Sequence, residues 1–286
     1  MTLHALLSTL GDEIQDTDEG ASVCSVTKII PSQDLGMVDP KASEIDVSIG
    51  KRDFIIQQAP GLLSSDRDGG TTGAALWRVT PFFAEWMSDQ KNMIFTTGVL
   101  NSESRVVELG CGISGLLAMT VSPLVELYIA TDQEYSLKRL RYNVAVNTQP
   151  ATRNTRRSKS EGHHLYTKEP KIITQILDWE NSVPSSLPTF EGGFNAVVAC
   201  DTVYNYALVD PFVQTCTDIC ALKTGDEPTI CVVAQQLRQP DVFDTWLKRF
   251  LSHFRCWRVP NDLLTENLRE GKGFVVHVGV LRQGRE

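Results

Sequence analysis

The sequence has no long apolar run, no surplus of positive charge and no paired-cysteine motif. No stretch approaches the roughly 18 consecutive apolar residues of a membrane-spanning helix, so no membrane segment is expected. The first 20 residues begin with an apolar helical pattern, but they have no basic flank and become acidic from Asp12 onward. We therefore do not expect a signal peptide.

The charge balance indicates which partners the protein prefers. The 286 residues include 27 Lys and Arg against 35 Asp and Glu, which gives a net charge of −8. Such a chain repels the phosphates of nucleic acids and attracts basic partners. The balance suits a basic protein partner, and nucleic acid is an unlikely one; we also expect a monomer with no membrane contact.

The cysteines and histidines do not form a metal or disulfide pattern. The seven cysteines are an odd number, form no CxxC pair and lie mostly in apolar runs, which is typical of core residues in a reducing compartment. The five histidines have no ligand spacing with cysteines or carboxylates, so no metal is predicted. The predicted location is the cytoplasm, with the nucleus as the alternative.

The chain divides into three parts by composition. Residues 1–44 are polar apart from an opening helical turn and a β-like run at 25–30, which predicts a loosely attached N-terminal arm. Residues 45–98 contain two alternating runs, typical of a β-hairpin, followed by apolar residues at helical spacing. Residues 99–286 are the predicted main domain. Its basic insertion at 148–170 is either a tether for an acidic partner or RNA, or a solvated loop.

From residue 105 onward, short apolar runs alternate with helical patterns. Strands are predicted at 105–109, 127–131, 171–177, 194–200 and 229–234, and helices at 113–121, 136–147, 208–222 and 242–253. This alternation predicts a doubly wound, mostly parallel α/β sheet with helices on both faces. The last two strands, at 255–259 and 274–281, have no covering helix between them, which predicts an antiparallel hairpin at the sheet edge.

A glycine motif lies at the first strand-to-helix turn. Residues 108–115 read Glu-Leu-Gly-Cys-Gly-Ile-Ser-Gly, and glycines at such a turn let the backbone approach a ligand closely. Asp132 ends the next predicted strand, 22 residues after Gly110, where a carboxylate can bind ribose hydroxyls. Dinucleotides and S-adenosylmethionine are both bound in this way.

Glu108 distinguishes between these two ligands. It precedes the glycine turn, where a dinucleotide would place a pyrophosphate that a carboxylate repels. S-adenosylmethionine instead carries a sulfonium and an ammonium group, which a carboxylate attracts. The motif therefore favours S-adenosylmethionine, and an NAD enzyme is the alternative.

Two further strand ends complete the predicted site, because parallel sheets bind ligands at the carboxyl ends of their strands. Asp178 and Trp179 follow the third strand, where the ring either covers an adenine or is a structural indole. Asp201 and Tyr204 follow the fourth strand, where they either hold an incoming nucleophile or, for Asp201, cap the next helix.

These residues resemble a known family. The glycine motif, Asp132, Asp178-Trp179, the Asp-Thr-Val-Tyr of residues 201–204 and the Gly-rich segment 69–77 are similar to the seven-stranded class I methyltransferases of the methyltransferase-like 21 group, or family 16. The resemblance covers about residues 50–282. It is strongest to fungal members that methylate ribosomal proteins. It implies a Rossmann-like fold and S-adenosylmethionine-dependent methylation of a lysine, with a large-subunit ribosomal protein as the expected substrate.

The resemblance also implies a role for each site residue. The predicted catalytic residues, which would face the acceptor amine, are Asp201 and Tyr204. The predicted cofactor-binding residues are Trp77, Glu108, Gly110, Cys111, Gly112, Asp132, Trp179 and Cys200. Among them Asp132 would bind the ribose and Trp179 would flank the adenine. Amide-directed relatives carry Asn-Pro-Pro-Tyr at the position of 201–204, so an Asp there favours an amine. The alternatives are a small-molecule methyltransferase and a cofactor-binding module without turnover.

Overall fold

The structure is a computed structural model that describes residues 2–16, 36–63, 72–148, 171–181 and 186–282. The expected β-like run at 25–30 lies outside the described residues, as do residues 69–71 of the Gly-rich segment and 149–170 of the basic insertion. The division of the chain at residues 44 and 98 stays a prediction.

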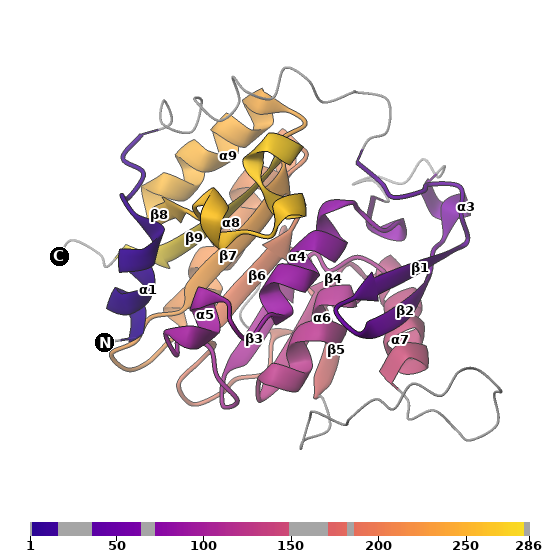
Figure 1. Cartoon of the computed structure of the whole chain (residues 1–286), viewed down its shortest axis with the longest axis horizontal. Helices are drawn as coiled ribbons and strands as arrows, with labels where there is room; N and C mark the ends of the chain where they lie inside the picture. Colours follow the sequence, from indigo (N-terminus) through magenta and orange to yellow (C-terminus); the bar gives the residue numbers. More distant parts are fainter. Residues whose placement is uncertain (1, 17–35, 64–71, 149–170, 182–185, 283–286) are drawn as a thin grey trace.

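A seven-stranded sheet forms the centre of the molecule (Figure 1). Its strands are β3 (Arg105–Leu109), β4 (Leu127–Asp132), β5 (Ile172–Ile176), β6 (Ala196–Cys200), β7 (Ile230–Gln236), β8 (Phe254–Arg258) and β9 (Phe274–Leu281). The order is β5-β4-β3-β6-β7-β9-β8, with the first five parallel and β9 antiparallel to both its neighbours. The mostly parallel sheet with an antiparallel edge pair, predicted from the sequence, is confirmed.

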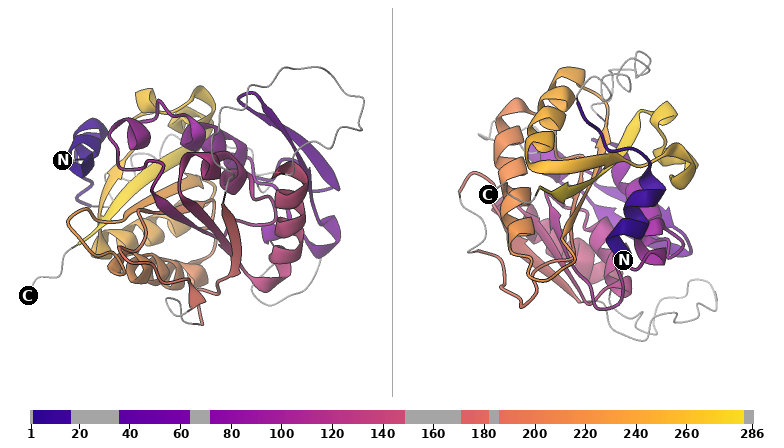
Figure 2. Two further views of the ribbon diagram at one scale, coloured as in Figure 1. Left: turned by 90° about the horizontal axis from the view of Figure 1, so that it is seen from below. Right: turned by 90° about the vertical axis from the view of Figure 1, so that its left-hand side faces the viewer.

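Helices cover both faces of the sheet (Figure 2). The longer helices are α1 (Thr2–Leu10), α4 (Val79–Ser88), α6 (Leu116–Val121), α7 (Glu134–Thr148), α8 (Tyr206–Ala221) and α9 (Pro240–His253). Shorter ones are α3 (Pro60–Leu63) and α5 (Met93–Thr96). The first four of the longer helices share a core with one sheet face, and α8 and α9 share a second core with the other. Of the described helices, none is both long and apolar enough to cross a membrane.

The predicted hairpin is present and is attached to α7. Strands β1 (Glu44–Ile49) and β2 (Arg52–Gln57) pair antiparallel, with Phe54 and Ile56 buried. Asn143 of α7 accepts a hydrogen bond from the backbone N–H of Gln57 at 2.9 Å and donates one to its carbonyl at 3.0 Å. Asn147 makes the same pair of bonds to Ile55. Two helix side chains thus replace the strand that β2 lacks.

Parts of the N-terminal region pack on the domain. Leu6 and Leu10 of α1 are buried against the core beside β8. Further along, Met37 forms a β-bridge with Trp77, and the carbonyl of Gly36 accepts a hydrogen bond from the backbone N–H of Arg78 at 2.8 Å. The β-bridge and this hydrogen bond place residues 36–38 beside the segment that leads into α4.

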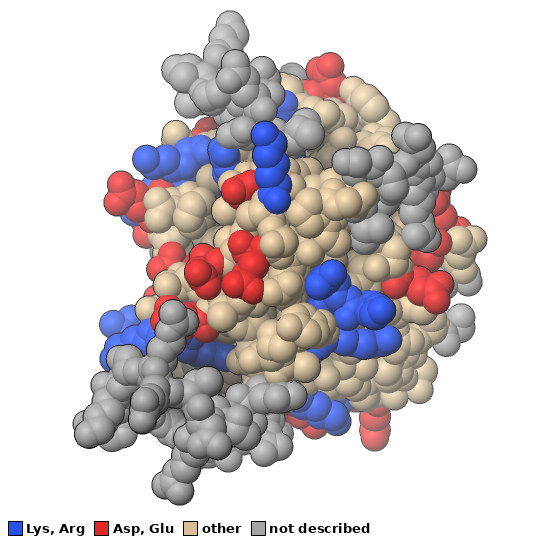
Figure 3. Space-filling view, turned by 90° about the vertical axis from the view of Figure 1, so that its right-hand side faces the viewer, with Lys and Arg blue, Asp and Glu red and all other residues tan. Residues whose placement is uncertain are grey.

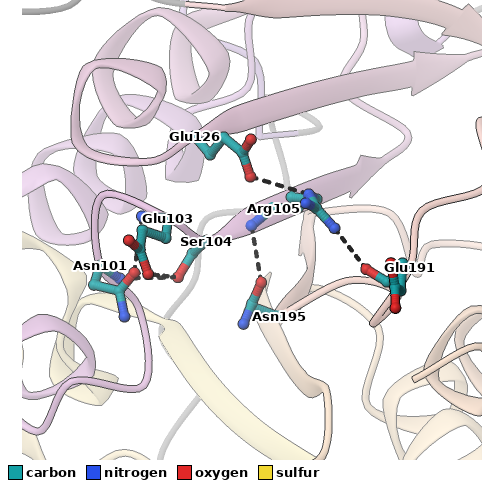
Figure 4. A network of polar contacts seen from close by, with 7 residues as sticks. All are labelled: Asn101, Glu103, Ser104, Arg105, Glu126, Glu191 and Asn195. Carbon is teal, nitrogen blue, oxygen red and sulfur yellow. Dashed lines mark hydrogen bonds and ion pairs between the residues drawn. The ribbon is translucent and has the colours of Figure 1, made fainter. Parts of the chain in front are cut away.

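Polar side chains connect the segments at the amino ends of the strands (Figure 4). Arg105 donates to Glu126 Oε2 at 3.0 Å and to the carbonyl of Glu191 at 2.8 Å, and Asn195 Oδ1 accepts from the Arg105 backbone N–H at 2.9 Å. Ser104 donates its hydroxyl to Asn101 Oδ1 at 3.4 Å. These bonds hold the start of β3 to the loops before β4 and β6.

Candidate active site

The turn after β3 is built so tightly that its glycines cannot be replaced. Gly110 and Gly112 have φ of 66° and 61°, which L side chains rarely adopt. A Cβ on Gly110 would lie 2.8 Å from the Thr202 methyl and 3.1 Å from the Trp179 ring, and one on Gly112 would lie 3.2 Å from the Gly73 carbonyl oxygen. The missing side chains let Thr202, Trp179 and the Gly73 backbone pack directly against this turn.

Asp132 holds this turn in place from the end of β4. Its Oδ2 accepts a hydrogen bond from the Gly112 N–H at 2.7 Å, and its Oδ1 accepts from the Gln133 N–H at 2.7 Å. The Ile113 N–H donates to the Gly73 carbonyl at 2.9 Å on the other side of the turn. Burial raises the pKa of Asp132, and the hydrogen bonds from the N–H groups of Gly112 and Gln133 oppose that rise.

Glu108 lies buried at the end of β3, with 2% of its surface exposed. The Tyr128 hydroxyl on β4 donates a hydrogen bond to its Oε2 at 2.9 Å. Burial raises the pKa of Glu108 to about 8, the hydrogen bond from Tyr128 opposes the rise, and the charge of Asp132 adds to it. At neutral pH the side chain is therefore largely protonated, and a cationic ligand beside it would draw it back to the carboxylate form.

Asp201 follows β6 in a strained conformation. It is the one non-glycine residue with positive φ, 55°, in the described part of the chain, and its N–H donates to the Ala234 carbonyl at 2.8 Å. Asp201 Oδ1 forms an ion pair with Arg238 Nη2 at 2.8 Å, whereas its buried Oδ2 has no partner. Burial raises the Asp201 pKa and Arg238 opposes the rise. The helix α8 is capped by Asn205, so the alternative role for Asp201 as helix cap is excluded.

Two tryptophans lie on different sides of the site. The Trp77 Nε1 donates to the Thr72 carbonyl at 3.0 Å, which holds the ring in the segment before α4. Trp179 packs edge-on against Phe212 with ring centroids 5.3 Å apart, and its buried Nε1 has no hydrogen-bond partner. An unpaired buried N–H is costly unless a ligand accepts from it.

The two cysteines of the site are not nucleophiles. Cys111 and Cys200 are both buried, and burial raises the pKa of each thiol. The Cys200 Sγ contacts the Thr80 hydroxyl at 3.7 Å, across the gap between β6 and α4. Both thiols therefore stay protonated and serve as small wall residues.

One pocket of about 860 Å³, including its open mouth, brings all ten predicted site residues together. Acidic residues that line it are Glu108, Asp132, Asp178, Glu180 and Asp201, and no Lys or Arg is among the described lining residues. On the face seen in Figure 3, the acidic and basic side chains of the described residues gather in separate patches. The pocket is therefore suited to cations, and a pyrophosphate would be repelled from it.

The pocket fits the S-adenosyl ligand predicted from the sequence. Gly110 and Gly112 line the pocket, so a ligand there would meet backbone without intervening side chains. The orphaned Trp179 Nε1 offers a donor for an adenine nitrogen, and the acidic lining suits a sulfonium and an ammonium group. None of these features matches the anionic centre of NAD.

A comparison with protein families decides between a methyltransferase and an NAD enzyme. Residues 57–251 match the model of a family described as lysine methyltransferase. The chain belongs to the lysine methyltransferase family. It is thus an enzyme that transfers methyl groups, and S-adenosylmethionine is the donor that this class implies. The resemblance and the enzyme class predicted from the motifs are confirmed.

Curated relatives agree with this lysine methyltransferase assignment. Ribosomal lysine N-methyltransferase 5 of Zygosaccharomyces rouxii is 30% identical over 70% of this chain and 71% of the relative. The protein of the same name from Kluyveromyces lactis is 29% identical over 76% of this chain and 81% of the relative. Among solved structures, the N-methyltransferase NodS of Bradyrhizobium japonicum is 12% identical, covers 78% of this chain and 96% of NodS, and has a TM-score of 0.47.

The lysine methyltransferase site also contains residues that the sequence did not reveal. Tyr135 lines the pocket, and its hydroxyl accepts a hydrogen bond from the Gly73 N–H at 3.1 Å. Arg238 pairs with Asp201 from the loop after β7. Neither lies in a recognisable motif. The one available signal was the position of Arg238 just beyond a predicted strand, where functional side chains gather in parallel sheets.

Proposed function

We propose that this protein is a cytoplasmic, monomeric S-adenosylmethionine-dependent protein-lysine N-methyltransferase whose substrate is a ribosomal protein of the large subunit. The observation that carries the proposal is the unpartnered, buried Oδ2 of Asp201 in an acidic pocket. A buried carboxylate oxygen of this kind is ready to accept a hydrogen bond from an amine. The printed names of the curated relatives support a ribosomal substrate.

The substrate class follows from charge. Ribosomal proteins are rich in Lys and Arg because they bind RNA, and such a chain is attracted to a protein with net charge −8. The pocket presents five acidic side chains to such a basic substrate. A lysine side chain is also long and thin enough to reach a buried oxygen while its own backbone stays outside.

The chain's own residues would prepare the amine for attack. S-adenosylmethionine, when bound, supplies an electrophilic methyl group. Asp201 Oδ2 would accept a hydrogen bond from the ε-amine and align its lone pair, while Tyr204 would form the wall of the channel. A lysine has a reference pKa near 10.4 and must first release a proton to the solvent; desolvation in the pocket would favour the neutral amine, and the acidic side chains would oppose this. Trp77, Glu108 and Asp132 would orient the donor.

The proposal is tested with purified ribosomal proteins and S-adenosylmethionine carrying a labelled methyl group. The wild-type protein is expected to label one lysine of a large-subunit protein, identified by mass spectrometry. Asp201→Asn should reduce the rate by about a hundredfold or more, because it removes the acceptor carboxylate. Asp210→Asn, an exposed acid on α8, is the matched control and should leave the rate unchanged.

Calorimetry with S-adenosylhomocysteine accompanies the assay and should give similar affinities for all three proteins. Equal labelling by wild type and Asp201→Asn would remove Asp201 from the mechanism. Label found in the low-mass fraction would indicate a small-molecule methyltransferase. Binding without transfer to any protein would indicate a cofactor-binding module.

A further inference from the structure

Arg238 lies between the acceptor side of the pocket and the N-terminal segments. It belongs to the loop between β7 and α9, and 17% of its side chain is exposed. Its Nη2 lies 2.8 Å from Asp201 Oδ1, and its guanidinium carbon lies 4.5 Å from the centre of the Trp77 ring. A single side chain thus contacts one residue predicted to face the acceptor and one predicted to face the donor.

The ion pair leaves the two oxygens of Asp201 in different states. Oδ1 contacts Arg238 and accepts a longer bond from the Gln236 N–H at 3.3 Å. Oδ2 is buried without a partner. Because Oδ1 is anchored and the backbone is held at φ 55°, the carboxylate cannot turn freely, and Oδ2 keeps one orientation.

The backbone around Gly36 encloses Arg238 from the other side. Gly36 has φ of 87°, and a Cβ there would lie 2.6 Å from Arg238 Nη1. The neighbouring Met37 forms the β-bridge with Trp77. The guanidinium is therefore held by the Trp77 ring, the Asp201 carboxylate and the backbone at Gly36, an arrangement that suits its planar shape.

We propose that Arg238 is a positioning residue for methyl transfer: it fixes Asp201 and Trp77 relative to each other, so that Asp201 Oδ2 is the oxygen that meets the acceptor amine. This inference rests on the proposed function, since it assigns the means by which that site is aligned. Arg238 itself touches neither donor nor acceptor in this scheme.

The charge of Arg238 also matters for the chemistry. Burial raises the pKa of Asp201, and the positive charge of Arg238 opposes that rise and so favours the ionised carboxylate, the stronger acceptor for an amine. The other titratable groups near Asp201 are Cys200 beside it, Tyr204 after it and Glu108 on β3. None of these carries a positive charge, so the compensation falls to Arg238.

The test uses Arg238→Gln, Arg238→Lys and a matched control. Arg255 makes the same two kinds of contact away from the pocket, an ion pair to Glu13 at 2.8 Å and a ring contact to Trp257 at 4.8 Å. Arg238→Gln is expected to lower kcat by about a hundredfold, because a small misplacement of a reacting group has that effect. The affinity for S-adenosylhomocysteine should change by no more than about threefold, which also shows that the variant folds. Arg255→Gln should leave kcat unchanged.

A second readout separates positioning from a merely structural role. The pKa of the Asp201 carboxyl is followed by carbon NMR in each protein, with Asp201→Asn to assign the signal. It should rise in Arg238→Gln, the acid limb of the kcat profile should move to higher pH, and Arg238→Lys should restore part of both. An unchanged titration would overturn the inference even if no acceptor protein is found, and so would a higher kcat in Arg238→Gln. If wild-type protein transfers no methyl group to any acceptor, the proposed function is refuted. The inference about Arg238 is then still tested, because the pKa of Asp201 can be compared between wild type and Arg238→Gln without an acceptor.

Discussion

Polar groups at the amino end of β3 are paired and part-exposed, whereas those around its carboxyl end are buried and incompletely paired. At the amino end, Arg105 is paired with Glu126, the Glu191 carbonyl and the Asn195 side chain, all of them part-exposed (Figure 4). Near the carboxyl end, three residues after Arg105, Glu108 is buried with a pKa raised to about 8. Across the pocket, one oxygen of Asp201 has no partner at all.

This difference separates groups that stabilise the fold from groups that are kept for a ligand. Paired polar groups near solvent add modest stability, and unpaired buried ones cost free energy until something binds. The carboxyl end of the sheet therefore lowers the stability of the free protein, and the amino end does not. The changes below are expected to show this in order of decreasing effect.

The largest effect is expected from Gly110→Ala, compared with Gly192→Ala at the amino end. Both glycines have positive φ, so each alanine should cost about 1–2 kcal/mol of unfolding free energy through backbone strain. Only the Gly110 side chain would meet Thr202 and Trp179, whereas Gly192 has open space. Calorimetry should show that binding of S-adenosylhomocysteine is lost in the first variant and retained in the second. Equal binding by both would mean that the ligand does not approach this turn.

The next effect is expected from Glu108→Gln. Loss of the carboxylate should weaken S-adenosylmethionine binding at pH 9 by about tenfold or more, since the ligand is cationic. The folded pKa near 8 lies above the ordinary value of 4.5, so the native state retains a proton that the unfolded state loses between these pH values. Wild-type stability should therefore fall as the pH rises from 4.5 to 8. The melting temperature of Glu108→Gln should therefore increase relative to that of wild type as the pH rises from 4.5 to 8. A difference in melting temperature that does not change with pH would contradict the raised pKa.

Tyr128→Phe should have a smaller effect on the same group. The Tyr128 hydroxyl stabilises the ionised form of Glu108, so its removal should raise the pKa of Glu108 further. In wild type, affinity for S-adenosylmethionine should increase as the pH rises through about 8 and then level off. In the variant the midpoint of this increase should move to higher pH. A midpoint that stays in place would show that the hydrogen bond does not control the ionisation.

The smallest effect is expected from Glu126→Gln at the amino end. Its ion pair with Arg105 is part-exposed, so the loss should be within about 1 kcal/mol of unfolding free energy in urea titrations. Binding of S-adenosylhomocysteine should not change. A loss of binding here would indicate that the two ends of β3 are coupled, and the contrast between them would fail.

Much of the fold could be predicted because its signals are local. The strand at 105–109 is a β-branched run stopped by glycine, and its predicted bounds agree with those of β3. The positions of Asp132 and Asp201 at strand ends follow from the rule that parallel strands finish on one edge. Nine of the ten predicted site residues line one pocket for this reason, Trp77 joins them from the segment before α4, and their individual roles stay predictions.

The rest depends on contacts between distant segments. Arg238 meets Asp201 because β7 lies beside β6, and it meets Trp77 because that segment crosses the same edge. No periodicity near residue 238 signals either contact. The raised pKa of Glu108 is equally hidden, since it depends on burial beneath several elements and on a tyrosine from the neighbouring strand.

The asparagine pair on α7 has a consequence for how the protein behaves in a crowded cell. Unpaired strand edges recruit other chains and start aggregates. Asn143 and Asn147 occupy the backbone N–H and carbonyl groups of Gln57 and Ile55 on β2, and the Ile55 side chain is 43% exposed. Helix α7 thus takes the place of a further strand at the β2 edge, and at these two positions an incoming strand would find no free backbone groups to pair with.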